Sequence, residues 1–375
     1  MDWEGEPIMK SFDHLAAFYK QEHKPDDFVK QVDSLLASEE RNVRAVPFGC
    51  NQASLDWLDG QICGDKKVSL VYRVDGLLAF RLDYKFTENG KEKSDTGTFF
   101  ILQQKDCPSV FVAFCLEPTP FFRRALQPLF QSLYPMIMQT FVSHKRMKRL
   151  LDTFKADGGY SDLIITRASQ RLRYQEGSHL NTMPIVSWPE MTLDDAFQWI
   201  QEHNGWFQSL EFEVMSRERS LATIAFTRQG IVRANSLFTR AYQTFIVPTC
   251  KTIDANLKLF SHRARLERTD SSALPLVIDF EGDQFQNVQE NRRLIQAMRR
   301  LKGSSVSVLH GNPYVHLSVL DYFDGSAFDL WVLDRRQLII VPQLKASIAA
   351  IKRLINHIFD DYAEGRLLDY KLPQP

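Results

Sequence analysis

The stretch from Tyr314 to Tyr362 constrains the fold most, because it changes from the period of a strand to that of a helix. Val315, Leu317 and Val319 alternate with other residues, which is typical of a strand with one buried face. FDLWVLD and QLIIV flank a polar turn at Arg335 and predict a hairpin whose second strand is central in a sheet. A helix should follow, because apolar residues recur every three or four positions at Leu344, Ile348, Ile351, Ile355, Ile358 and Tyr362.

The polar residues of this predicted helix fall outside its apolar stripe. Lys345 and Ala346 open the helix, and Lys352 and Arg353 lie elsewhere on its circumference. Gly365 is a stop signal. We therefore expect an amphipathic helix with one apolar stripe.

Composition bounds the class of protein. The chain has 375 residues, 44% of them hydrophobic and 25% charged, as in folded globular proteins. Lys and Arg together number 46, as do Asp and Glu, so a site for nucleic acid or another anion must be a local patch. The five cysteines show no paired spacing, and neither a secretory signal nor a long apolar run is evident. We expect a cytoplasmic protein that does not contact a membrane.

Earlier parts of the chain repeat the order of elements seen near the end. Helical patterns cover 11–39, an irregular piece spans Arg44 to Asn51, and hairpins are expected to turn near Asp106 and Gln229, as near Arg335. The helix after each hairpin has a similar opening, with the pairs Arg124-Ala125, Arg240-Ala241 and Lys345-Ala346. A structural repeat and a chance likeness between short α+β segments both account for this pattern.

The fold that we predict is α+β, with three related units. Each unit comprises a helix, a three-stranded antiparallel meander and a second helix. The predicted boundaries give a helical N-terminal segment (1–43) and units at 44–157, 158–270 and 271–375. The same order of elements occurs in double-stranded-RNA-binding domains and in secretion-chaperone-like sandwiches, but the glycine- and lysine-rich helix entry of the former is missing here.

Motifs that carry catalysis are absent from the sequence. It contains no Walker loop, GxGxxG, GxSxG, HExxH or CxxC, so we predict neither a cofactor nor a catalytic residue. His316 alternates to the face opposite Asp321, which argues against a metal site there. Asp83-Tyr84-Lys85, with Asp75 upstream, is similar to the metal-binding pattern of restriction-endonuclease-like nucleases, and equally resembles the solvent face of any strand.

Basic clusters are the strongest candidates for a binding site. They follow the helices of the first two predicted units, and basic residues also open the final helix of each unit. Cations at helix ends can simply complement the helix dipole, whereas several together can bind phosphate. The candidate phosphate-binding residues are Arg124, Lys145, Arg146, Lys148, Arg149, Arg240, His262, Arg263, Arg265, Arg268 and Lys345.

The absence of catalytic motifs favours a non-enzymatic binding or scaffolding subunit of a cytoplasmic, bacterial assembly. Its partner would be another protein or a second copy of the chain. The alternative function is nucleic-acid binding through the basic clusters, with metal-dependent nuclease activity as a remote extension.

Overall fold

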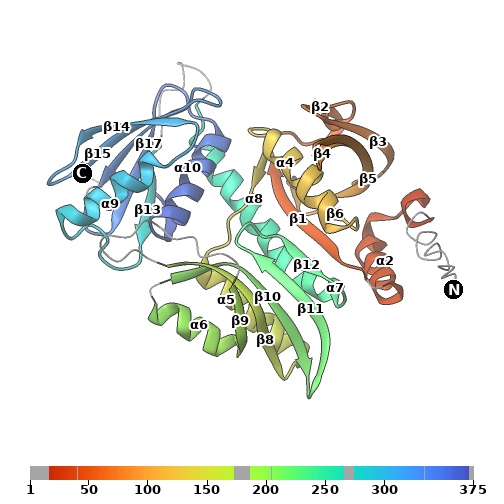
Figure 1. Ribbon diagram of the computed structural model, residues 1–375. Coiled ribbons are helices and arrows are strands. Elements are labelled where there is room, and N and C mark those ends of the chain that lie inside the picture. The colour runs from red at the N-terminus through yellow and green to blue at the C-terminus, as the bar shows by residue number, and fades with distance from the viewer. Residues whose placement is uncertain are drawn as a thin grey trace. The chain divides into compact units, whose positions relative to one another are not determined.

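The computed structural model describes residues 17–39, 41–172, 186–203, 205–265, 274–332 and 334–370. By its internal contacts the chain forms two compact units (Figure 1). Unit 1 comprises Met1–Leu133 and Gln139–Ile253, and unit 2 comprises Tyr134–Met138 and Asp254–Pro375. The domain boundaries expected from the sequence remain predictions.

Unit 1 is built on one long antiparallel sheet with the strand order β2-β3-β4-β5-β6-β1-β12-β11-β10-β8-β9. Its strands are β1 (Val43–Cys50), β2 (Ile62–Cys63), β3 (Lys66–Val74), β4 (Leu77–Glu88), β5 (Lys91–Gln104), β6 (Cys107–Cys115), β8 (Asp162–Leu172), β9 (Val186–Thr192), β10 (Gly205–Ser216), β11 (Arg219–Thr227) and β12 (Val232–Ala234). The short strand β7 (Ile137–Gln139) precedes α5 in the chain. The predicted hairpins near Asp106 and Gln229 are confirmed by the pairing of β5 with β6 and of β11 with β12.

Strand β1 overturns the prediction of three helix, three-strand, helix units. The piece from Arg44 to Asn51 was expected to be irregular, but every residue of β1 is buried, and β1 pairs with β6 on one side and β12 on the other. The first two hairpins therefore belong to one continuous sheet. Pro47 lies opposite Val112 in the middle of this strand, where proline normally argues against a strand, which explains why the sequence pattern failed. The fold is sheet-rich and mostly antiparallel.

The helices of unit 1 connect and cover these strands. They are α2 (Pro25–Ser38), the 3₁₀ turn η1 (Asp56–Leu58), α3 (Thr119–Phe121), the π-helix η2 (Phe122–Leu126), α4 (Gln127–Ser132), α5 (His144–Gly158), α6 (Leu193–Glu202), α7 (Phe238–Ala241), the π-helix η3 (Tyr242–Ile246) and α8 (Val247–Ser261), which continues into unit 2. No helix within the described ranges has the length and the apolar run needed to cross a bilayer.

Aromatic side chains fill two parts of the unit 1 core. Phe28 of α2 packs against Phe100 and Phe114, with ring centroids 5.0 and 5.1 Å away. Farther along the sheet, Phe245 lies 5.0 Å from Phe154 and 4.9 Å from Phe226. These helices thus bury apolar rings on the sheet, in the manner expected of core aromatics.

Unit 2 is a smaller antiparallel sheet, accompanied in its described part by α9, α10 and the end of α8. Its strand order is β14-β15-β16-β17-β13-β18, so β17 lies inside the sheet, as its apolar sequence predicted. The strands are β13 (Leu276–Phe280), β14 (Ser304–His310), β15 (Val315–Asp321), β16 (Ala327–Val332), β17 (Gln337–Pro342) and β18 (Gly365–Asp369), and the helices are α9 (Val288–Arg299) and α10 (Ile348–Asp361). The predicted hairpin of β16 and β17 is confirmed.

Helix α10 differs from its prediction at its start and on its polar side. It begins after Ser347, whose side chain accepts a hydrogen bond from the backbone N–H of Ala350, so Lys345 and Ala346 precede the helix. Leu344 is exposed. Lys352, expected outside the apolar stripe, is only 4% exposed, because the segment around Met138 covers it and the Met138 carbonyl lies 3.5 Å from its Nζ.

Candidate functional site

Helix α5 carries the first predicted phosphate-binding cluster. Lys145 and Arg149 are exposed on it, whereas Arg146 donates to the carbonyl of Pro248 at 2.9 Å. Burial, followed by the charge of Arg149, lowers the pKa of Arg146. The guanidinium of Arg146 therefore contributes to packing between α5 and α8.

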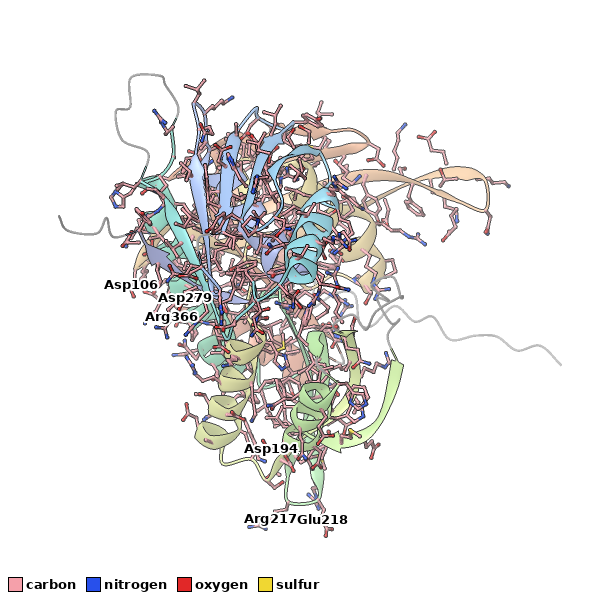
Figure 2. The ribbon with its side chains drawn as sticks, turned by 90° about the vertical axis from the view of Figure 1, so that its left-hand side faces the viewer. Asp106, Asp194, Arg217, Glu218, Asp279 and Arg366 are labelled. Carbon is pink, nitrogen blue, oxygen red and sulfur yellow. The ribbon has the colours of Figure 1, made fainter. Side chains whose placement is uncertain are left out.

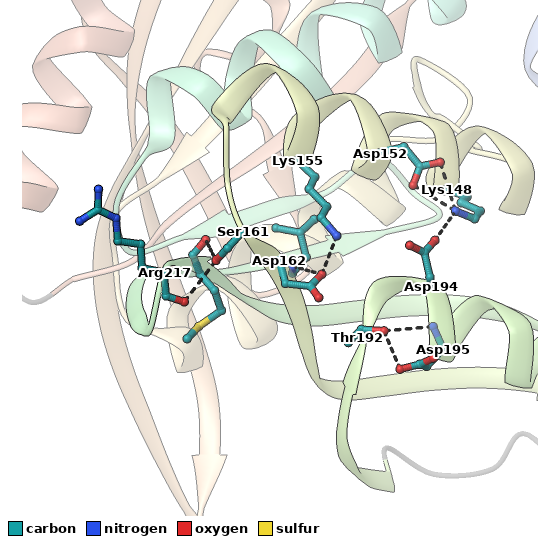
Figure 3. A network of polar contacts seen from close by, with 11 residues as sticks. Lys148, Asp152, Lys155, Ser161, Asp162, Thr192, Asp194, Asp195 and Arg217 are labelled. Carbon is teal, nitrogen blue, oxygen red and sulfur yellow. Dashed lines mark hydrogen bonds and ion pairs between the residues drawn. The ribbon is translucent and has the colours of Figure 1, made fainter.

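Lys148 is held by two acids. Its Nζ lies 3.0 Å from Asp152 on the same helix and 3.0 Å from Asp194 at the start of α6 (Figure 3). Burial tends to lower the pKa of Lys148, but the hydrogen bonds to Asp152 and Asp194 outweigh it, and its pKa is raised. This arrangement gives Lys148 the role of a clamp between two helices.

Two further predicted residues contact aromatic rings. The guanidinium of Arg124 lies 4.8 Å from the ring centroid of Phe86 and 3.4 Å from the carboxylate of Glu88. Arg240 lies 5.8 Å from the ring centroid of Tyr160. Such cation–π contacts stabilise the fold by up to about 1 kcal/mol at exposed sites, so both arginines have a structural role.

The remaining candidates belong to unit 2 and vary in exposure. His262 and Lys345 are exposed, and Lys345 donates to the carbonyl of Asp324. Arg263 is 2% exposed and donates to the Leu259 carbonyl and to Asp369. Arg265 exchanges backbone hydrogen bonds with Ala346, at 2.8 and 2.9 Å. Arg268 lies outside the described residues. Phosphate binding by these clusters remains a prediction.

Strands β3, β4 and β5 line an open cleft of about 930 Å³ that includes Asp83 and Lys85. Asp83 accepts from Arg81 at 2.9 Å, and Lys85 pairs with Glu92 at 2.9 Å. Hydrogen bonding by Thr96, followed by Arg81, lowers the pKa of Asp83. Asp75 precedes β4, and the six steps from Leu77 to Asp83 span roughly 20 Å of strand, too far for the two acids to share one metal.

No group of three or more His, Cys, Asp or Glu side chains suited to a metal occurs among the described residues. His316 lies on the face of β15 opposite Asp321, as predicted, and stacks on Trp331 with ring centroids 3.7 Å apart. Its Nε2 is 3.6 Å from Asp329. The histidine is thus part of a side-chain stack on the sheet.

The outer edge of β14 is the most distinctive surface feature of unit 2. Strand β14 ends the sheet, and within the described ranges no strand pairs with its other side. Val308 is 37% exposed and Leu309 is 57% exposed. The seven residues of β14 include no Lys, Arg, Asp, Glu or Pro. An edge without charge or proline is a ready template for another strand.

The register of β14 shows which backbone groups face outward. The N–H of Tyr322 donates to the carbonyl of Gly303, and Ser305 and Ser307 stand opposite Leu320 and Ser318. In an antiparallel ladder, bonded pairs alternate with non-bonded pairs, so Ser305 and Ser307 bond to β15. The N–H and C=O groups of Val306 and Val308 therefore point away from the sheet.

Helix α9 flanks this edge with a mixed apolar and basic stripe. A Cβ on Gly311 would lie 3.6 Å from Ile295 Cδ1 and 3.7 Å from Val308 Cγ1, so both side chains border Gly311 in the turn. Arg292 and Arg299 stand three and four residues from Ile295, on the same helix face, and both are exposed. We call Val288, Arg292, Ile295 and Arg299 the α9 stripe.

Sequence reasoning did not predict β14. The signal was present, because serine and valine alternate through Ser305, Val306, Ser307 and Val308, but the run is short and only weakly apolar. Strand β18 was missed too, since Gly365 was interpreted only as a helix stop. Comparison with protein-family models and with curated proteins finds no match for this chain.

Proposed function

We propose that this chain is a non-enzymatic binding or scaffolding subunit that accepts an extended segment of a partner protein as an added strand on β14. The observation that supports this proposal is the uncharged edge whose Val306 and Val308 amides face outward. Backbone hydrogen bonds to such an edge provide affinity, and contacts with alternate side chains provide specificity.

The other sheet edges in the described part of the chain carry features that oppose such pairing. Strand β2 is only two residues long, and β9 contains the exposed Glu190. Strand β18 carries Arg366 and Asp369. Short strands, proline and charge are the ways in which proteins protect edges from unwanted pairing. Strand β14 has an irregularity in its register between Val308 and His310 but is neither short nor interrupted by proline or charge, which supports a role in binding.

The apolar surface near β14 gives further support. Tyr314 is 64% exposed in the turn after β14, and Leu320 is 42% exposed on the neighbouring strand. Val308 and Leu309 are on the edge strand itself, where an added strand would lie beside them. A partner would cover apolar area here that is otherwise in contact with water.

The proposal is tested by removing one outward amide. Val308→Pro deletes the N–H that faces outward but no ladder bond to β15, and Val308→Thr is the matched control because it keeps the N–H and the branched shape. Three short capped peptides serve as probes, alternating valine with glutamate, with serine or with lysine. Binding is measured by fluorescence anisotropy, and folding by circular dichroism.

We expect at least one peptide to bind the wild-type chain and Val308→Thr with equal affinity. The same peptide should bind folded Val308→Pro about tenfold more weakly, because one backbone hydrogen bond is lost. Equal affinity for Val308→Pro, or no binding of any of the three peptides, would contradict the proposal. If Val308→Pro does not fold, the same peptide carrying N-methyl groups on its bonding face replaces the variant, and undiminished binding of that peptide contradicts the proposal.

A further inference from the structure

The α9 stripe concentrates positive charge beside the β14 edge. Among the described residues, Arg293 pairs with Glu290 at 2.7 Å and Arg300 pairs with Asp361 at 3.6 Å. Neither Arg292 nor Arg299 has an ion-pair partner within that part of the chain, and both are exposed. The two free cations of α9 are therefore the two that stand on the stripe.

The helix dipole explains only one of these two arginines. Arg299 lies in the last turn of α9, where a cation favours the negative helix end. Arg292 lies two turns earlier, where the dipole gives no such preference. Lys302, just after the helix, is also exposed and adds to the positive potential.

Side-chain alternation on an added strand relates this charge to the identity of the partner. Val308 of β14 and Ile295 of α9 both border Gly311, which places α9 on the side of the sheet to which Val308 points. Every second side chain of a strand added to β14 would therefore point toward the stripe. Carboxylates at those positions would approach Arg292 and Arg299. Pairing with the β14 edge of a second copy would instead bring two basic stripes together, which like-charge repulsion disfavours.

We infer that the segment bound at β14 is extended and acidic, with carboxylates on the alternate residues that face Arg292 and Arg299. This inference rests on the proposed function, because it concerns the occupant of the same edge. The stripe selects the partner by charge, while the outward amides of Val306 and Val308 hold any extended backbone.

The inference is tested with the same three peptides at low and at physiological salt. We expect the glutamate peptide to bind about tenfold more tightly than the serine peptide at low salt, because each exposed ion pair adds a few-fold, and the lysine peptide to bind most weakly. Salt should narrow this difference, since it screens exposed charges. Equal binding of the three peptides would overturn the inference.

Charge reversal identifies the residues responsible. The double variant Arg292→Glu with Arg299→Glu should reverse the order of the three peptides, whereas the matched variant Arg293→Glu with Arg300→Glu, on the paired cations, should keep glutamate first. An unchanged order in the first variant would overturn the assignment to the stripe. If the three peptides bind equally, or if the double variant keeps their order, the serine peptide still binds. If the proposed function is wrong, the serine peptide does not bind.

If the strand added to β14 came from a second copy of this chain, sedimentation would show a dimer of the wild-type chain and a monomer of Val308→Pro. We expect the wild-type chain and the variant to sediment alike. A dimer that depends on Val308, without peptide binding, would overturn the acidic partner.

Discussion

Strands β14 and β18 are the two edges of one six-stranded sheet, and the chain treats them differently. At β18, Asp369 pairs with the buried Arg263, and Arg366 stands opposite Asp279 of β13 (Figure 2). At β14 no charged side chain projects from the strand. One edge is thus anchored by contacts within the unit, and the other keeps its outward backbone groups available.

Packing shows the same contrast. A Cβ on Gly365, the first residue of β18, would lie 2.6 Å from Ile278 Cγ2 and 2.9 Å from the Asp279 carbonyl. A Cβ on Gly311, in the turn after β14, would approach nothing closer than 3.6 Å. The difference indicates that β18 begins with tight backbone packing, whereas the turn after β14 has room for a methyl group.

The largest expected effect comes from Lys352 on α10, the helix between β17 and β18 in the chain. Burial alone lowers its pKa from 10.5 to about 7. Below its folded pKa, the charged form costs the folded state several kcal/mol, and this cost falls as pH rises from about 7 to 10.5, because the unfolded chain then binds more protons. Lys352→Met should raise the free energy of unfolding of unit 2 by about 4 kcal/mol at neutral pH, measured in urea.

The pH profile separates this charge effect from simple packing. The advantage of Lys352→Met should shrink to about half at pH 9, since about half of the penalty has then been relieved. The exposed Lys345→Met is the matched control, and its effect should not vary with pH. A constant advantage for Lys352→Met would show that the pKa of Lys352 is the same in the folded and the unfolded chain. A change at the β14 amides in this variant would show that α10 and the β14 edge are coupled.

The next effect in size tests the packing contrast directly. Gly365→Ala should lower the free energy of unfolding by about 2–3 kcal/mol, because the new methyl group has no room beside Ile278. Gly311→Ala should change it by less than about 0.5 kcal/mol. Chemical denaturation of both variants measures the difference, and equal costs would remove the distinction between a packed and an open edge.

The smallest effect concerns the charge anchor of β18. Arg263→Met removes a buried guanidinium that donates to the Leu259 carbonyl and to Asp369, and should cost about 1–2 kcal/mol. Arg292→Met on the α9 stripe should leave stability within about 0.5 kcal/mol. Thermal unfolding compares the two variants. If Arg292→Met were the more destabilising, the stripe would have a structural role.

Much of unit 2 could be predicted from its sequence, because strand and helix periods there reflect real burial. Val315, Leu317 and Val319 are buried as expected, and so is the helix stripe from Ile351 onward. The failures have physical causes. Lys352 is covered by a segment more than two hundred residues away in the sequence, which no local period reveals, and β1 includes a proline that hides a central strand.

The candidate site itself was less accessible to sequence reasoning. An edge strand is defined by the neighbour it lacks, and a sequence does not show strand order. The arginines of α9 were noticed as a basic helix face, but only the fold separates the paired Arg293 and Arg300 from the unpaired Arg292 and Arg299. The clusters at 145–149 and 261–265, more prominent in sequence, are largely used for internal contacts.

The α9 stripe and the β14 edge come from one uninterrupted stretch of chain, residues 288–310. The charges that would select a partner and the amides that would hold it are therefore inherited together. Exchange of this single stretch should transfer both properties at once, with the rest of the sheet serving as a support. Change of partner in the course of evolution would need substitutions only on one face of a helix, while the mode of binding stays the same.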